Sequence, residues 1–186
     1  LDAETLELEL KLLFRNAPIH GLALVSNKIF VSIGQTIEVY NADTFQLIGL
    51  YAVPGISTNL IVDAANDVLV FLNDRLVKLN SKNGTTRSIE LPGARTLSTT
   101  WPGSSAALDR ETNILYYLVD GPTPETYELR AYDLRNNLSI ITKTNALRID
   151  GIYVDQFEKR LVLTSQETSE GKLNILDMSG EPMAIV

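Results

Sequence analysis

The sequence predicts an all-β fold of about four four-stranded antiparallel units, arranged as blades of a β-propeller. Two observations support this prediction. Short apolar runs, separated by turn signals such as Asn-Gly and Asn-Asp, recur in four groups with a period of roughly 40 to 50 residues. No segment of this repeat shows a long helical period, which argues against an α/β fold.

The four units align strand by strand, and they place acidic residues at matching positions. The predicted strands are residues 21–25, 29–33, 36–41 and 45–50 in the first unit, 58–63, 68–72, 76–80 and 86–91 in the second, 105–109, 114–119, 128–133 and 138–142 in the third, and 151–155, 160–164, 172–177 and 183–186 in the fourth. Asp63, Asp109 and Asp155 are the last residues of the first strands of three units, at equal intervals of 46 residues. Their side chains can accept a hydrogen bond from the backbone two residues on, so we predict turn formers.

A metal-binding interpretation of these three aspartates is also open, because hard cations prefer carboxylate ligands. Equivalent positions on successive blades are separated by the width of a blade, however. That separation exceeds a coordination sphere and favours the turn interpretation.

The length of 186 residues indicates one domain, residues 1–186. Four units form either a small closed ring or part of a larger propeller, and we favour the larger propeller. Residues 4–14 alternate Leu with charged residues and are predicted as a strand, with a helix as the alternative. An incomplete propeller would expose apolar blade faces and strand edges, and self-association is one expected consequence.

Composition argues against several classes of partner. The net charge is −7 and basic residues do not cluster, so no nucleic-acid partner is expected. No apolar run approaches the roughly 20 residues of a membrane-spanning helix, so membrane insertion is not expected. The chain has no cysteine, which removes disulfides and thiolate chemistry. The compartment stays open, although we favour an extracytoplasmic location over the cytoplasm.

The sequence offers few candidate catalytic residues. His20 is the only histidine, and one imidazole cannot form a multi-histidine metal site. There is no Gly-x-Ser-x-Gly nucleophile motif either. We therefore predict no metal and no organic cofactor, and we lean against an enzyme. The tyrosines within predicted strands are expected to pack between blades: Tyr116, Tyr117, Tyr132 and Tyr153.

The longest connections are predicted to emerge on one face of the propeller. Trp101 lies in the connection between the second and third units, and residues 120–126 and 166–171 are longer loops between second and third strands. Trp and Arg are favoured residues at binding hot spots, and function concentrates on loops held by a rigid scaffold. The alternative for Trp101 is a hydrophobic plug over a blade junction. The candidate binding residues are Trp101, Arg95, Glu125, Tyr127, Glu167 and His20.

The third unit carries a recognisable sequence. Residues 107–120, ALDRETNILYYLVD, resemble the blades of YWTD and NHL propellers and of the bacterial YVTN propellers, and residues 151–165 are a second example. The resemblance implies a propeller used mostly as a binding platform, and some relatives are lactonases or other hydrolases.

Three functions follow from this resemblance and the sparse chemistry. The chain could be a non-enzymatic module that holds a protein or peptide, a hydrolase with a carboxylate-bound metal at the central channel, or an architectural part of a larger propeller. We expect the first.

Overall fold

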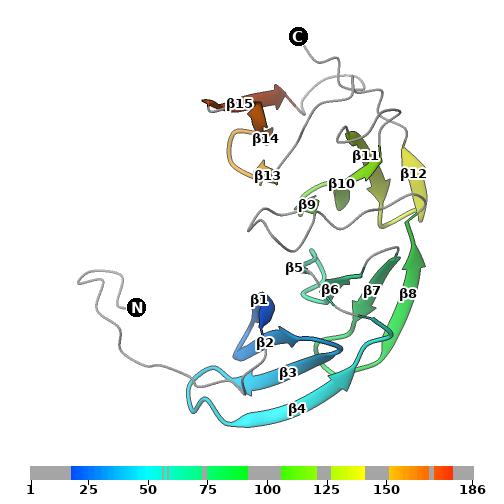
Figure 1. The fold of residues 1–186 in the computed structure, drawn as a ribbon. Coiled ribbons are helices and arrows are strands. Elements are labelled where there is room, and N and C mark those ends of the chain that lie inside the picture. Colours follow the sequence, from blue (N-terminus) through cyan, green and yellow to red (C-terminus); the bar gives the residue numbers. More distant parts are fainter. Residues whose placement is uncertain are drawn as a thin grey trace.

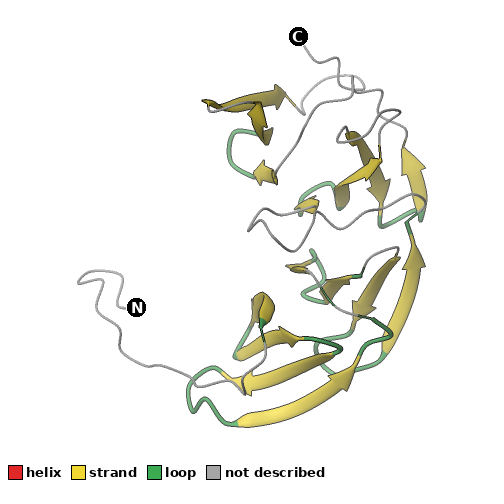
Figure 2. Cartoon of the chain, in the orientation of Figure 1, coloured by secondary structure: helices red, strands yellow, loops and turns green. Residues whose placement is uncertain are grey.

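The computed structural model describes four antiparallel sheets that follow one another along the chain and curve into an open arc (Figure 1). The described residues are 18–55, 57, 59–72, 75–91, 106–120, 127–140, 151–167 and 170–177. Their regular structure is entirely strand, as Figure 2 shows. Within these ranges, no helix is long and apolar enough to cross a bilayer. The predicted all-β class with four-stranded units is confirmed.

Each sheet is one blade, and its strands pair in chain order. Blade 1 contains β1 (Ile19–Val25), β2 (Lys28–Ile33), β3 (Thr36–Asn41) and β4 (Leu47–Ala52). Blade 2 contains β5 (Asn59–Val62), β6 (Val68–Phe71), β7 (Arg75–Leu79) and β8 (Thr86–Glu90). Blade 3 contains β9 (Ala106–Asp109), β10 (Ile114–Asp120), β11 (Tyr127–Asp133) and β12 (Leu138–Ile140). Blade 4 contains β13 (Gly151–Asp155), β14 (Arg160–Glu167) and β15 (Glu170–Asp177).

Two predicted strands cannot be compared with the structure. Residues 4–14, predicted as a strand or helix before the first unit, lie outside the described residues. The predicted fourth strand of blade 4, residues 183–186, lies outside them as well.

Apolar side chains fill the space between successive blades. We call the face of a blade that looks toward the preceding blade its leading face, and the opposite face its trailing face. Ala23 and Phe30 on the trailing face of blade 1 form a core with Leu60 and Val70 on the leading face of blade 2. Blades 2 and 3, and blades 3 and 4, are joined by equivalent cores. Because side chains alternate along a strand, an interior blade is apolar on both faces, which explains the nearly continuous apolar runs in the sequence.

The turn role predicted for the three repeated aspartates is confirmed. In blade 2, Asp63 Oδ1 accepts hydrogen bonds from the backbone N–H groups two and four residues on, both at 2.9 Å. Asp109 and Asp155 each accept the N–H two residues on, at 3.0 Å. Each carboxylate therefore satisfies the turn that joins the first strand of its blade to the second.

The turns between third and fourth strands also repeat a backbone conformation. Phe45, Gly84 and Asn137 occupy matching positions in blades 1, 2 and 3, and all three have positive φ angles, of 55°, 73° and 54°. Glycine suits position 84 for two reasons. It adopts a positive φ without strain, and an added Cβ would lie 2.2 Å from the ring of Tyr51. The turn of blade 2 thus packs closely against β4 of blade 1.

Three of the four strand tyrosines are buried as expected, and one is not. Tyr116, Tyr117 and Tyr132 lie in the cores that join blades 2, 3 and 4. Tyr153 is 49% exposed, so its predicted packing role is wrong. The physical reason is its position on the trailing face of blade 4, because the core that joins blades 3 and 4 takes its blade 4 residues from the opposite face.

Candidate functional site

The stacked blades form two rims, and the two rims carry different connections between strands. We call the rim with the first-to-second and third-to-fourth turns the turn face, and the rim with the second-to-third connections the loop face. On the turn face, Lys28 Nζ of blade 1 donates to the Ser81 carbonyl of blade 2 at 2.8 Å. On the loop face, the N–H of Ser57 donates to the Gly34 carbonyl at 3.2 Å. Successive blades therefore present the same ends on the same side.

Three of the predicted binding residues lie outside the described residues. Arg95 and Trp101 belong to residues 92–105, which join blade 2 to blade 3. Glu125 belongs to residues 121–126, which join β10 to β11. Their connections begin and end on the loop face, because β8 ends there, β9 begins there, and β10 and β11 meet there. Their position as binding residues stays a prediction.

The other three predicted residues lie at strand ends on the loop face. His20 is half-buried in β1, beside the register shift between Ile19 and Gly21. Tyr127 is the first residue of β11 and pairs with Asp120. Glu167 is the last residue of β14. The topology therefore brings positions from blades 1, 3 and 4 to one rim.

The loop expected around Glu167 is shorter than predicted. Residues 166–171 were expected as a long connection, but β14 runs through Glu167 and β15 begins at Glu170. Gln166 pairs with Gly171, and Glu167 pairs with Glu170. The polar composition of this segment suggested a loop, whereas the regular register of a long hairpin continues through it.

The turn face concentrates carboxylates, but they are engaged by the backbone. Asp63, Asp109 and Asp155 already accept the turn N–H groups, and each serves its own blade. Among the described ranges, no group of three His, Cys, Asp or Glu side chains is arranged to hold a metal ion.

Blade 2 adds an ion pair to its turn. Lys78 Nζ lies 2.6 Å from Asp63 Oδ2 and 3.2 Å from Asp67 Oδ2, and the Asp63 side chain is buried. Burial lowers the pKa of Lys78, but the hydrogen bonds and charges of Asp63 and Asp67 outweigh this effect, so its pKa is raised above 10.5. The ammonium therefore lies between two carboxylates that a single turn brings together, and it offsets the charge of one of them.

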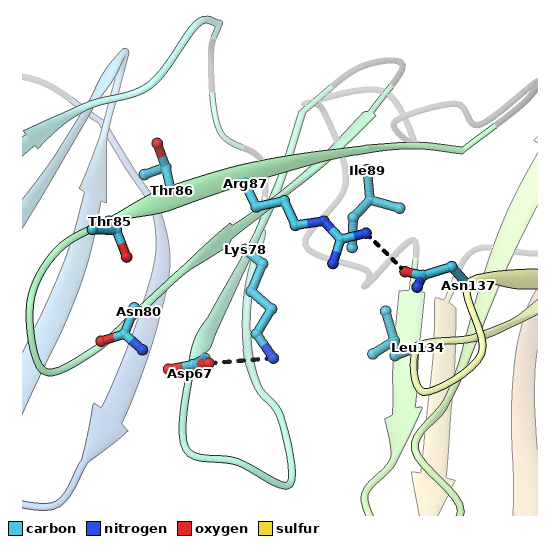
Figure 3. A pocket seen from close by; sticks show the side chains of 9 residues that line it. All are labelled: Asp67, Lys78, Asn80, Thr85, Thr86, Arg87, Ile89, Leu134 and Asn137. Carbon is cyan, nitrogen blue, oxygen red and sulfur yellow. Dashed lines mark hydrogen bonds and ion pairs between the residues drawn. The ribbon is translucent and has the colours of Figure 1, made fainter.

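A polar pocket of about 240 Å³ opens beside this ion pair, between blades 2 and 3 (Figure 3). Its lining residues are Asp67, Lys78, Asn80, Thr85, Thr86, Arg87, Ile89, Leu134 and Asn137. Arg87 Nη2 donates to Asn137 Oδ1 at 3.3 Å and connects the two blades across the pocket. Ile89 and Leu134 supply an apolar part of the wall.

The pocket offers both hydrogen-bond donors and hydrogen-bond acceptors, since guanidinium, amide and hydroxyl groups line it. Sequence reasoning did not identify it. Its residues come from β7, β8 and the turns of two blades, and none forms a recognisable motif. The spacing of Asp67 and Lys78 across the hairpin was the available signal, because residues near the same end of neighbouring strands can form an ion pair.

Solved structures with a similar fold are β-propeller proteins. The chain is similar to Kuenenia stuttgartiensis hydrazine synthase, with a TM-score of 0.68, 11% identity, and coverage of 96% of this chain and 53% of that chain. The WD40 domain of Neurospora crassa Pan2 gives a TM-score of 0.61, 11% identity, and coverage of 86% and 49%. A quinonprotein alcohol dehydrogenase-like protein from Bacteroides thetaiotaomicron gives a TM-score of 0.64, 13% identity, and coverage of 87% and 44%.

These likenesses establish the propeller fold and nothing finer, because the sequence identities are low. The chain spans about half the length of the solved structures that it resembles here. Neither a protein-family profile nor a curated protein sequence matches the chain.

Proposed function

We propose that residues 1–186 form one non-enzymatic interaction domain that holds a protein or peptide partner on the loop face. The observation that carries the proposal is that His20, Tyr127 and Glu167 all lie at strand ends on this rim. The connections that contain Trp101, Arg95 and Glu125 start and end on the same rim.

The stack of blades supports this proposal because it provides a rigid base for the loops. Between blades 3 and 4, Gln156 Nε2 donates to the Leu108 carbonyl at 2.7 Å, and Gln156 Oε1 accepts the N–H of Arg110 at 3.1 Å. Such hydrogen bonds add to the apolar cores that join all four blades. Binding groups on a rigid scaffold lose less conformational entropy when a partner binds.

The likenesses agree with a binding platform. One similar structure is a WD40 domain, and WD40 repeats build propellers from four-stranded blades. The resemblance of residues 107–120 to YWTD, NHL and YVTN blades implies the same use. Metal-dependent hydrolysis is not part of the proposal, because Asp63, Asp109 and Asp155 serve their turns.

The test uses peptides selected from a displayed peptide library against the immobilised 186-residue chain. Trp101→Ala should weaken the selected peptide by about 2 kcal/mol or more, the usual hot-spot threshold, and leave the free energy of unfolding unchanged. Phe157→Ala is the matched control, because Phe157 is an aromatic residue on the turn face that is 89% exposed. This control should bind the peptide as the unmodified chain does.

Two results would contradict the proposal. If Trp101 is a plug, its replacement lowers stability by about 3–5 kcal/mol while affinity per folded molecule holds. If Phe157→Ala weakens the peptide as much as Trp101→Ala does, the partner does not use the loop face.

A further inference from the structure

Blade 2 differs from blades 1 and 3 at one position of its trailing face. Its third and fourth strands place Lys78 directly opposite Arg87. The residues that match Lys78 are Val39 and Ala131, since each lies two residues before the side chain that accepts the N–H groups of the following turn. Val39 and Ala131 are both 2% exposed and belong to inter-blade cores. In blade 2, two cationic side chains replace this apolar filling, and the pocket of Figure 3 opens there.

The two opposed cations have unequal partners. Like charges directly opposite each other on neighbouring strands repel. Lys78 turns toward Asp63 and Asp67 and pairs with both. Arg87 donates to the neutral side-chain oxygen of Asn137 at 3.3 Å, and no carboxylate of the described residues pairs with it. Its guanidinium carries five N–H donors in a planar fork that matches a carboxylate, so Arg87 can bind an anion.

The wall beside Arg87 is apolar. Ile89 follows Arg87 by two residues on β8, so both side chains are on the face of the strand that looks toward blade 3. Leu134 of blade 3 lies on the other side of the pocket (Figure 3). A short carbon chain attached to the bound anion would therefore contact apolar side chains from both blades.

The end of the pocket at the turn between β7 and β8 suits a hydroxyl group. Asn80 Oδ1 accepts the N–H groups of Lys82 and Asn83, at 3.1 and 3.0 Å, which leaves the Asn80 amide NH₂ to donate. Thr85 Oγ1 donates to Asn83 Oδ1 at 2.8 Å, and its lone pairs can still accept a hydrogen bond. A ligand hydroxyl can accept from the first side chain and donate to the second.

The size and charge of the pocket limit the ligand further. Its volume of about 240 Å³ equals roughly eight water molecules at ~30 Å³ each, and it is below the ~300–1,000 Å³ of pockets for drug-sized ligands. Asp63 and Asp67 together exceed Lys78 by one negative charge. A second anionic group on the ligand would therefore be repelled at the Lys78 end of the pocket.

We propose that this pocket binds a small hydroxy acid with a single carboxylate. The ligand carboxylate accepts hydrogen bonds from Arg87, and its carbon chain contacts Ile89 and Leu134. Its hydroxyl group meets Asn80 and Thr85 at the turn. The site lies on the turn face between blades 2 and 3, so this proposal can fail while binding at the loop face holds.

The experiment titrates the isotope-labelled 186-residue chain with 3-hydroxybutyrate and follows the backbone amide resonances by NMR. We expect saturable shifts at residues 85–89 and 134–137, with a dissociation constant in the millimolar range because so small a ligand makes few contacts. The analogue without the carboxylate, 1,3-butanediol, should bind about tenfold more weakly or worse. Butyrate, which lacks the hydroxyl group, should bind about threefold more weakly. Malate, which has a second carboxylate, should bind no more tightly than 3-hydroxybutyrate.

Two variants assign the binding to the guanidinium. Arg87→Gln should weaken 3-hydroxybutyrate by about tenfold or more and leave the amide resonances of blades 1 and 4 unchanged, because Arg87 is exposed. Arg160→Gln is the matched control, since Arg160 is an exposed arginine of blade 4 that does not line the pocket. It should bind 3-hydroxybutyrate as the unmodified chain does.

Four results would overturn the proposal. The first is the absence of saturable shifts at the pocket residues. The second is binding of 1,3-butanediol or butyrate as tight as that of 3-hydroxybutyrate. The third is tighter binding of malate, which would contradict the limit to one carboxylate. The fourth is an equal effect of Arg87→Gln and Arg160→Gln, which would show that the acid responds to surface charge and not to this pocket.

Discussion

Blades 1 and 2 carry a leucine at the same position, and the two leucines have opposite surroundings. Leu60 lies in the core between the blades, whereas Leu22 is exposed on the leading face of blade 1. Both lie in first strands, and each pairs with a valine. The difference shows that burial in this fold is a property of the stack, since each blade is apolar on faces that only a neighbour can cover.

The largest expected effect compares these two leucines. Leu60→Ala should lower the free energy of unfolding by about 3 kcal/mol, because it removes buried methyl groups and leaves a cavity. Leu22→Ala should change it by less than about 0.5 kcal/mol in the monomer, because the side chain already faces solvent. Urea unfolding at low protein concentration measures both. Equal losses would show that Leu22 is covered within a single chain.

The repeated aspartates extend the comparison to polar residues. Asp63→Ala should cost about 2–3 kcal/mol, because it removes two hydrogen bonds to the turn and leaves Lys78 without its closest carboxylate. Asp155→Ala at the end of the arc should cost about 1 kcal/mol, since Asp155 is less buried. Thermal unfolding of the two variants under identical conditions provides the measurement. A larger loss for Asp155 would contradict this ranking.

Substitutions at two glycines distinguish the stability cost of backbone strain from the cost of disturbed packing between blades. Gly34 and Gly84 both have positive φ, but an added Cβ meets nothing at Gly34 and the Tyr51 ring at Gly84. Gly34→Ala should cost about 1 kcal/mol from strain alone, and Gly84→Ala about 2 kcal/mol. In a Tyr51→Ala background, the cost of Gly84→Ala should fall to that of Gly34→Ala. A double-mutant cycle by urea unfolding tests this, and an unchanged cost would rule out the overlap.

The smallest effect concerns a surface contact between blades 3 and 4. Lys159 forms an ion pair with the exposed carboxylate of Glu111. Glu111→Gln should lower stability only slightly, because water and salt screen an exposed ion pair, and added salt should remove the difference. Thermal unfolding at low and high ionic strength checks this. A loss that salt does not reduce would assign Glu111 a role other than charge.

The sequence correctly predicted features that each repeat encodes locally. It failed where a neighbouring blade determines whether a side chain is buried. The strands within the described residues and the turn role of Asp63, Asp109 and Asp155 follow from alternation and local hydrogen bonding, and both are confirmed. Tyr153 was misassigned because its strand pattern is the same as that of buried tyrosines. Glu167 was placed in a loop because polar residues also suit the exposed end of a hairpin.

The pocket between blades 2 and 3 could not be predicted for the same reason. Arg87 and Asn137 meet there although they are far apart in the sequence and belong to different blades. Only the docking of one blade on the next sets the distance between these two side chains. Turn chemistry is local, whereas pockets and open faces depend on how the blades stack.

The absence of cysteine from the chain permits a direct test of the claim that a neighbouring blade determines burial at a given repeat position. Leu22→Cys and Leu60→Cys place one thiol at the same repeat position of blades 1 and 2. At concentrations where the chain is monomeric, the rate of thiol labelling reports how well each position is covered. We expect Cys at position 22 to react as fast as a thiol in an unfolded peptide, and Cys at position 60 to react only through unfolding. Equal, slow rates at both positions would contradict the account.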